Sequence, residues 1–322
     1  MKTLTVFTPT YNRMHTLTRT YESLCRQTCK DFDWLVIDDG SSDGTREWLE
    51  SLGAKVLTSG PKFDWMGRRI SEKLDSVSHF VIQTPDICIE YVYKPNGGLY
   101  TGYNVAYQTI QTELCVCVDS DDYMPDDAVA KIVALWKDKD SKKYCGIAGL
   151  DFDVRTKEPI GGYFTEDVDE ICALELNHVG DMKYAFRTEL MRAVAPQIGF
   201  EGERDFNPHY MQMQVLDQFP ILLLNENLCW VEYQIGGDSM SQGIFKQYVR
   251  SPRSYAKYRL MELKMNHGMT GKRKLMLHVH YVSSCILSRN MNILKESPNY
   301  LLTLLAFPLT FAELLYIKIK VK

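Results

Sequence analysis

Three carboxylates lie close together at the end of an apolar stretch of the sequence. Residues 115–125 read CVCVDSDDYMP, so Asp119, Asp121 and Asp122 follow a run that is typical of a buried strand. Like charges at this spacing repel and raise each other's pKa unless a cation or a set of N–H donors compensates them. A divalent cation held by carboxylate oxygens, with positions left for a diphosphate, is one such arrangement.

Two interpretations of this cluster remain open from the residues alone. Aspartates at a turn also accept hydrogen bonds from local backbone N–H groups and cap helices. Asp126 and Asp127 already suit the start of the following helix, so the three upstream aspartates exceed what capping needs. Counting from Asp119 places Met124 where a calcium EF-hand needs glycine and Ala130 where it needs glutamate, which excludes that motif. The pattern therefore favours a metal–diphosphate site over capping.

Alternating strand and helix patterns surround the cluster. Short β-rich runs occur at residues 4–8, 34–38, 89–94 and 114–118, and each is followed by a turn or a helical pattern. Residues 60–90 predict an irregular insertion with one helix. Continuous apolar strands that alternate with helices predict an α/β fold with a mostly parallel central sheet flanked by helices.

Polar residues follow three of these strands at the points where they end. These are Asp119 to Asp122, the pair Asp38 and Asp39, and the run from Thr10 to Arg13. Ligands of parallel sheets bind beyond the carboxyl ends of the strands. We therefore expect the three loops to meet at one edge of the sheet.

Composition limits the function classes. The net charge is −4 and the pI is about 6.0, which does not indicate a nucleic-acid footprint over the whole chain. The nine cysteines are scattered, no signal-peptide pattern precedes Thr3, and no Asn-x-Ser/Thr sequon occurs. These features predict a cytoplasmic protein with free thiols.

Four segments in this order carry a resemblance to a known family. TVFTPTYNR, VIDDGSSDGT, KPNGG and VDSDDYMPDD resemble the family 2 glycosyltransferases of the GT-A fold, which is a Rossmann-like arrangement. The resemblance is specific through about residue 135 and looser at residues 198–206 and 230–241. The stretch between Leu57 and Tyr91 is longer than in simpler members, so no site position is carried over there.

The resemblance implies how these loops would hold a nucleotide. Tyr11 would stack on the base, with Thr8 and Pro9 shaping the pocket. Asp39 would accept a hydrogen bond from the base or the ribose, with Asp38 nearby. The backbone would approach the donor at Asn96, Gly97 and Gly98.

The resemblance also implies a metal site at the Asp-x-Asp motif. Asp121 would bind Mn²⁺ or Mg²⁺ that bridges two phosphates, and Asp119 would share that site or reach the ribose or sugar. Ser120 belongs to the same donor-binding set, and Asp122 would assist either role. Many relatives meet the pyrophosphate with an arginine after the Gly-Gly pair. This chain departs from that pattern: Lys94 or Arg13 would replace the arginine, because the positions after Gly98 hold Tyr100, Tyr103 and Asn104.

Inverting sugar transfer needs a carboxylate to take the proton of the acceptor hydroxyl. The relatives' Gly-Glu pattern falls on Gly202 and Glu203, which makes Glu203 the predicted base, with Asp205 and Asp181 in reserve. A solvated acidic loop is the alternative for this segment. Aromatic and charged residues that suit a sugar acceptor occur in two other segments: Trp65, Arg68, Trp230, Glu232 and Tyr233.

The chain is expected to hold a catalytic domain, residues 1–240, and a helical C-terminal extension, residues 241–322. Within the first, residues 1–125 would bind the nucleotide sugar and metal, and residues 126–240 the acceptor. The run from Tyr300 to Ile317 is apolar except for Thr303, Thr310 and Glu313, and Pro308 interrupts it. A helix lying in a membrane interface, with basic groups on anionic headgroups, fits this run better than a full span. The lysines that would meet those headgroups are Lys318, Lys320 and Lys322. An ordinary docked helix is the alternative.

These inferences predict a metal-dependent, inverting glycosyltransferase of the hexosyltransferase type. It would move a sugar from a nucleotide-diphosphate donor, with UDP expected, to a glycan or lipid-linked acceptor in surface polysaccharide biosynthesis. The predicted location is cytoplasmic, and peripheral on the inner face of the membrane. Two alternatives stay open: a non-catalytic nucleotide-sugar-binding protein of this fold, and an aspartyl-phosphate-type phosphatase.

Overall fold

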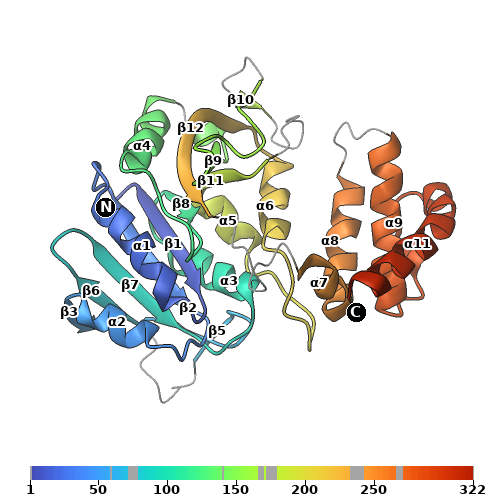
Figure 1. Cartoon of the computed structure of the whole chain (residues 1–322), viewed down its shortest axis with the longest axis horizontal. Helices are drawn as coiled ribbons and strands as arrows, with labels where there is room; N and C mark the ends of the chain where they lie inside the picture. Colours follow the sequence, from blue (N-terminus) through green and yellow to red (C-terminus); the bar gives the residue numbers. More distant parts are fainter. Residues whose placement is uncertain are drawn as a thin grey trace. The chain divides into compact units, whose positions relative to one another are not determined.

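A computed structural model of the chain describes residues 2–58, 60–71, 79–139, 141–165, 170–171, 180–232, 243–265 and 271–321. The chain divides into two compact units, drawn in Figure 1. The first comprises residues 1–197 and 211–233, and the second comprises residues 198–210 and 234–322. The segment 198–210, which carries Glu203 and Asp205, thus groups with the C-terminal helices. The division at residue 240 into a catalytic domain and an extension stays a prediction.

Ten of the described strands form one sheet in the first unit. Their order is β10-β12-β9-β11-β8-β1-β2-β7-β6-β3. The bounds are β1 Leu4–Thr10, β2 Phe32–Asp38, β3 Ala54–Leu57, β6 His79–Gln83, β7 Cys88–Tyr93, β8 Leu114–Cys117, β9 Gly146–Asp153, β10 Glu170–Ile171, β11 Met182–Arg187 and β12 Ile221–Val231. A separate pair is formed by β4 Lys62–Phe63 and β5 Arg69–Ile70.

The centre of the sheet is parallel. Strand β1 pairs in parallel with both β2 and β8, and β2 pairs in parallel with β7. Strand β11 runs antiparallel to β8 and β9, and β6 runs antiparallel to β7 and β3. The prediction of a mostly parallel α/β sheet flanked by helices is confirmed.

Both faces of the centre of the sheet are buried, and because side chains alternate along each strand, the central strands contribute to two apolar clusters. On β2, Trp34 and Val36 join one apolar cluster, and Leu35 and Ile37 join the other. Helices α1 Met14–Cys25, α2 Thr45–Ser51 and α4 Ala128–Asp138 contribute to the first cluster. Helices α3 Leu99–Thr109, α5 Thr188–Val194 and α6 His209–Leu216 contribute to the second. A short 3-10 turn, Ser141–Lys143, precedes β9.

The second unit has an apolar core of its own. Its helices are α7 Ile244–Arg250, α8 Pro252–Lys264, α9 Gly271–Leu287, α10 Ile293–Glu296 and α11 Tyr300–Lys320. Leu263, Val279, Val282 and Ala306 are among the buried residues that pack together there. The predicted terminal helix is present as α11, which continues through Pro308.

The insertion contains strands that were not predicted: β4, β5 and β6 lie in its described parts, residues 60–71 and 79–90. These parts hold no helix, and residues 72–78, where the predicted helix could fall, lie outside the described residues. Helix α4 begins at Ala128, directly after the two aspartates that were expected at its start. Asp127 lies at its N-cap without a capping hydrogen bond from its side chain.

Candidate functional site

The three predicted loops meet at the carboxyl ends of β1, β2 and β8. Because β1 lies between the other two strands, their ends are adjacent. The loop after β1 is tied to the loop after β2 through Asn12, whose backbone N–H donates to Ser41 Oγ at 2.9 Å. In return, Ser42 N donates to Asn12 Oδ1 at 2.8 Å. Asn12 adopts a φ of 52°, a left-handed conformation that Asn tolerates better than most residues.

Asp38 is fully buried and is the last residue of β2. Its carboxylate accepts hydrogen bonds from the Tyr91 hydroxyl and from Ser41 N, both at 2.7 Å. Burial raises its pKa, and these two donors oppose that change. Asp38 therefore holds the loop after β2 against β7.

Asp39 organises the glycine turn after β7. Its carboxylate accepts from Gly97 N at 3.0 Å and from Gly98 N at 2.9 Å, and it pairs with the buried Lys94. Asn96 Nδ2 donates to it at 3.1 Å. Burial raises the pKa of Asp39, and Lys94 opposes the rise. Both oxygens are thus occupied within the protein, which gives Asp39 a positioning role here. Its predicted contact with base or ribose stays a prediction.

The glycine at position 97 is required by close approach. A Cβ on Gly97 would lie 1.8 Å from the backbone oxygen of Trp65, so a side chain would displace the insertion loop. Gly98 has a φ of 97°, a conformation that favours glycine. The KPNGG turn is therefore shaped from both sides, by Asp39 and by Trp65.

The remaining residues of the predicted base pocket lie around β1. Thr8 is buried, and its Oγ1 accepts from Trp34 Nε1 at 3.0 Å. Pro9 is buried against α3, where a Cβ on Gly102 would lie 3.2 Å from Pro9 Cβ. Tyr11 is 50% exposed, which leaves ring surface accessible for stacking. Arg13 is the N-cap of α1, and its carbonyl accepts from Thr16 N and Leu17 N.

The Asp-x-Asp loop is held through its backbone. Arg19 on α1 donates to the carbonyl of Asp121, and Thr20 Oγ1 donates to that of Asp122 at 2.7 Å. Tyr123 and Trp230 exchange two backbone hydrogen bonds, at 3.2 and 2.7 Å. The predicted acceptor residue Trp230 therefore acts at least as a strand partner of this loop. Tyr233, proposed with it, lies outside the described residues.

The carboxylates of the motif receive few protein donors. Across the described ranges, no group donates a hydrogen bond to the Asp121 carboxylate. Asp119 receives one contact, from the Cys117 thiol at 3.7 Å. This differs from Asp38 and Asp39, which are saturated by donors. It also argues against a capping role, because a cap would accept from helix N–H groups.

A buried lysine compensates part of the charge. Lys183 on β11 places its Nζ 3.6 Å from Asp151 Oδ1 and 4.0 Å from Asp122 Oδ2, with 10% of its side chain exposed. Burial alone would lower the pKa of Lys183, but the carboxylates of Asp151, Asp122 and Asp119 raise it well above its usual range. The repulsion among the aspartates is therefore met in part by an internal cation.

The carboxylates around Lys183 are nonetheless hard to ionise. Burial raises the pKa of Asp151 to about 6, and the charges of Asp181 and Asp119 add to the rise. Burial also raises the pKa of Asp119, with Asp121 contributing. The pKa of Asp122 is raised well above its ordinary value for the same reason. One lysine among this many carboxylates leaves an excess of negative charge that a further cation would relieve.

The residues fit an open cation site. Among the described residues, no three Asp, Glu, His or Cys side chains form a group that could hold a metal by themselves. Asp119 and Asp121 offer carboxylate oxygens that few protein donors occupy, which suits Mg²⁺ or Mn²⁺ bound with waters and substrate phosphates.

Sequence reasoning missed Lys183, Asp151 and Arg19. Lys183 is a lone basic residue in MKYAFR, and nothing local marks it as buried. The residues that follow Gly98, where the resemblance led us to expect an arginine, make contacts within the protein. Asn104 donates to the carbonyls of Met66 and Gln197, each at 2.9 Å, and Tyr100 and Tyr103 are buried.

Glu203 anchors helix α8 in the second unit. It is 4% exposed, and its oxygens accept from Arg253 N at 3.1 Å, Arg253 Nε at 2.9 Å, Ser254 N at 2.8 Å and Ser254 Oγ at 2.7 Å. A carboxylate at a helix N-terminus is stabilised by the free N–H groups there. Asp205 pairs in a similar way with Arg250 and Ser251. The catalytic role of Glu203 stays a prediction, alongside this structural one.

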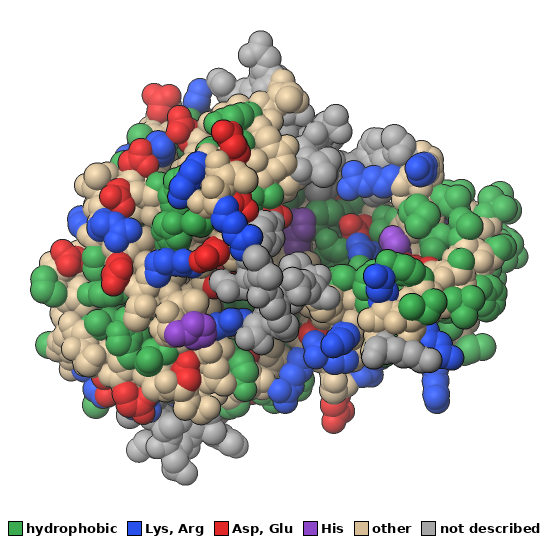
Figure 2. Space-filling model, viewed as in Figure 1, with side chains coloured by type: hydrophobic (Ala, Val, Ile, Leu, Met, Phe, Trp, Pro, Cys, Tyr) green, Lys and Arg blue, Asp and Glu red, His purple; other side chains and the backbone are tan. Residues whose placement is uncertain are grey.

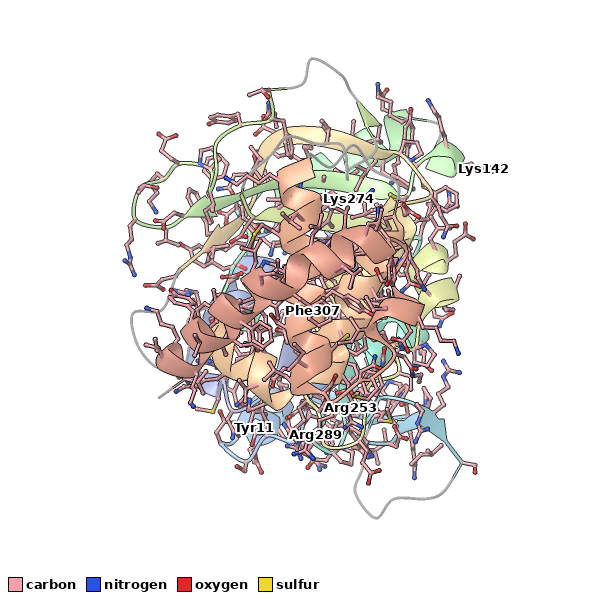
Figure 3. The ribbon with its side chains drawn as sticks, turned by 90° about the vertical axis from the view of Figure 1, so that its right-hand side faces the viewer. Tyr11, Lys142, Arg253, Lys274, Arg289 and Phe307 are labelled. Carbon is pink, nitrogen blue, oxygen red and sulfur yellow. The ribbon has the colours of Figure 1, made fainter. Side chains whose placement is uncertain are left out.

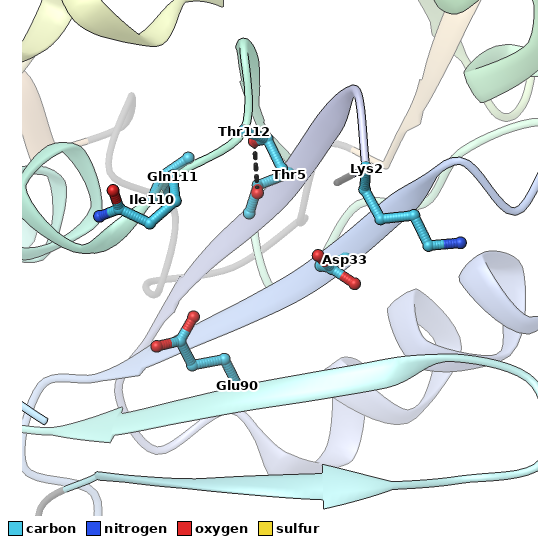
Figure 4. Close-up of a pocket in the computed structure, with 7 residues that line it drawn as sticks. All are labelled: Lys2, Thr5, Asp33, Glu90, Ile110, Gln111 and Thr112. Atoms are coloured by element: carbon cyan, nitrogen blue, oxygen red, sulfur yellow. Dashed lines mark hydrogen bonds between the residues drawn. The ribbon is translucent and has the colours of Figure 1, made fainter. Parts of the chain in front are cut away.

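A cavity elsewhere does not belong to this site. It has a volume of about 450 Å³ and lies toward the opposite ends of the central strands (Figure 4). Within it, Thr5 Oγ1 and Thr112 Oγ1 share a hydrogen bond of 2.7 Å. Its lining comprises Lys2, Thr5, Asp33, Glu90, Ile110, Gln111 and Thr112.

Solved structures share the fold at low sequence identity. The crystal structure of TarS from S. aureus matches with a TM-score of 0.57 and 17% identity, over 89% of this chain and 44% of that chain. This chain thus spans less than half of that longer protein. TarS 1-349 in complex with UDP-GlcNAc matches with a TM-score of 0.56 and 18% identity, over 89% of this chain and 73% of that chain.

A mannosyltransferase, PcManGT from Pyrobaculum calidifontis, in complex with GDP-Man and Mn²⁺, is also similar. Its TM-score is 0.50 at 15% identity, over 96% of this chain and 75% of that chain. No curated protein sequence matches this chain. The sequence profile of Glycosyl transferase family 2 matches residues 5–69 and 72–177, which include β1, β2, β7 and β8 and the loops that follow them. The chain therefore belongs to glycosyl transferase family 2.

Proposed function

We propose that this glycosyltransferase moves a hexose from a nucleotide-diphosphate donor, UDP-linked, to a hydroxyl of a glycan or lipid-linked acceptor with inversion. The observation that carries the proposal is the pair Asp119 and Asp121, which few protein donors occupy at the carboxyl end of β8. Structures of the same fold are complexes with UDP-GlcNAc, with UDP and with GDP-Man and Mn²⁺, which supports a nucleotide-sugar donor. Surface polysaccharide biosynthesis in the cytoplasm is the proposed setting.

The residues divide the work as follows. Tyr11 stacks on the base, and the turn shaped by Asp39 and Gly97 lets the backbone approach the donor. Asp121 and Asp119 would hold a divalent cation, which would supply positive charge next to the leaving diphosphate. The acceptor oxygen forms a bond to the anomeric carbon as the bond from that carbon to the diphosphate oxygen breaks. The hydroxyl proton passes to a carboxylate.

A panel of nucleotides tests the donor site. We expect UDP with Mn²⁺ to raise the unfolding temperature more than UDP or Mn²⁺ alone, because the cation would join Asp121 to the diphosphate. A ligand at ~100 times its Kd stabilises by about 2.7 kcal/mol. Differential scanning fluorimetry with UDP and GDP, each with Mn²⁺ or EDTA, measures this. Equal shifts in EDTA would remove the metal from the proposal, and a larger shift with GDP would change the nucleoside.

Glu203 is the proposed base, with Asp205 and Asp181 in reserve. Glu203→Gln is expected to lower transfer by about 10²–10⁴-fold while UDP–Mn²⁺ affinity is retained. Because Glu203 also anchors α8, the rate is measured well below the variant's unfolding temperature. Exposed Glu201, changed to Gln, is the matched control. If Asp181→Asn or Asp205→Asn shows the loss instead, the base role moves to that residue.

The same assays separate the alternative functions. A non-catalytic binding protein would show the nucleotide shift without any transfer or hydrolysis of a UDP-sugar. The phosphatase alternative is not supported, because the motif follows β8 in a family 2 chain, whereas such phosphatases place it after their first strand.

A further inference from the structure

Helix α11 exposes many of its large apolar side chains and buries its threonines. It is 21 residues long, an 18-residue window of it has a mean hydropathy of 1.7, and 22% of that window is buried. Of the helices that the structure describes, this one is long and apolar enough to cross a membrane. In a soluble protein the apolar face of such a helix packs inward.

The inward face of α11 carries its polar residues as well as the buried Ala306 and Ile317. Thr303 is fully buried, and its Oγ1 lies 2.9 Å from His278 Nδ1 on α9. Thr310 is fully buried and donates to the carbonyl of Ala306. Glu313 pairs with His280 and accepts from the Ser283 hydroxyl. The polar residues that broke the apolar pattern of this segment thus dock it on α9.

The outward face is apolar along the whole helix. Leu301 is 69% exposed, Leu305 65%, Phe311 61%, Leu315 63% and Ile319 71%. Figure 2 shows hydrophobic side chains gathered on this part of the surface, and Figure 3 views the same unit with Phe307 of α11 and Lys274 of α9 labelled. A continuous exposed patch of this kind marks a surface that meets a partner or a membrane.

The net charge of the second unit indicates which kind of surface its exposed apolar face would contact. The second unit, residues 198–210 and 234–322, holds fifteen lysines and arginines against seven aspartates and glutamates, a net charge of +8, whereas the whole chain has −4. Lys318 and Lys320 are exposed at the end of α11, and Lys272, Arg273 and Lys274 are exposed at the start of α9. Two copies of this unit would repel each other, but an anionic lipid surface would attract it.

We propose that α11 lies flat in the interface of an anionic membrane, with its outward side chains among the lipids and its polar face still docked on α9. A transmembrane orientation would break the pairs made by Thr303 and Glu313. This binding stands independently of sugar transfer, since the nucleotide loops belong to the other unit.

The test is sedimentation of the full chain with vesicles of phosphatidylcholine alone or mixed equally with phosphatidylglycerol. We expect binding to the mixed vesicles that weakens as salt rises. Changing Leu301, Leu305 and Phe311 to Ser is expected to weaken it more than about 100-fold, because each buried apolar side chain adds to the affinity. Changing Lys272, Arg273 and Lys274 to Gln is expected to weaken it about 100-fold.

The matched control changes exposed apolar residues of the other unit, Val56 and Leu57 on β3, to Ser, and it should bind like the wild type. Circular dichroism checks that each variant is folded, and the basic variant remains informative if the apolar one unfolds. The tryptophan emission of Leu305→Trp, but not that of Leu57→Trp, should shift to the blue on mixed vesicles. No binding by the wild type would overturn the proposal. So would a dimer in solution that the Leu301, Leu305 and Phe311 variant abolishes, because the partner would then be a second copy.

Discussion

Asp121→Asn is expected to fold normally and to lose its metal-dependent nucleotide binding. The loop is held through the carbonyl of Asp121, which Arg19 contacts, and through the backbone pair of Tyr123 and Trp230. The variant keeps these contacts and removes the charge of a carboxylate that no described group satisfies. Sugar transfer should fall by more than about 100-fold, since metal stabilisation of a leaving group contributes several kcal/mol. Calorimetric titration with UDP and Mn²⁺ measures the binding.

Asp126→Asn is the matched control for this change. Asp126 lies in the same loop, is exposed, and pairs with Arg26 at 3.1 Å on the surface. It should keep both the nucleotide shift and the transfer rate. Normal turnover by Asp121→Asn, or an equal loss in both variants, would return the cluster to a structural role.

Lys183→Met is expected to destabilise the protein by about 3–5 kcal/mol, because it leaves the buried carboxylates of Asp122 and Asp151 without their cation. Asp151 is 4% exposed and Asp122 is 6% exposed, so water cannot replace the lysine. Urea denaturation followed by circular dichroism measures the free energy of unfolding. Lys183→Arg should retain most of it, since the positive charge is kept.

Two comparisons separate this effect from the loss of a surface ion pair. Lys131→Met removes exposed pairs with Asp127 and Glu226 and should cost less than about 1 kcal/mol. Adding Asp151→Asn to Lys183→Met should recover part of the loss, because one of the unpaired charges disappears. If Lys183→Met is as stable as the wild type, the aspartates are neutralised by protonation and the lysine is dispensable.

Local patterns were sufficient to predict the framework of the site. Continuous apolar strands such as LTVFT and WLVID are buried on both faces, so their sequence alone indicates a parallel sheet. Polar residues placed directly after such strands fall at the carboxyl edge in any fold of this kind. The meeting of the loops at Asn12, Asp38 and Asp119 follows from that rule. The strands of the insertion were not predicted, because strands as short as β4 and β5 carry no periodic pattern long enough to detect.

The partners of charged side chains were decided by tertiary structure. The residues at Asp39 and Asp121 look alike in sequence, yet Asp39 is saturated by a turn after β7 and Asp121 is not. Lys183 meets Asp122 because β11 inserts between β8 and β9, a pairing that no local signal encodes. The sequence of α11 likewise shows an apolar helix with three polar residues, and packing on α9 decided that those three face inward. Element type and strand ends depend on neighbours in the chain, so the sequence alone determines them. Which carboxylate is left for a ligand depends on contacts between distant segments, and only the folded structure decides it.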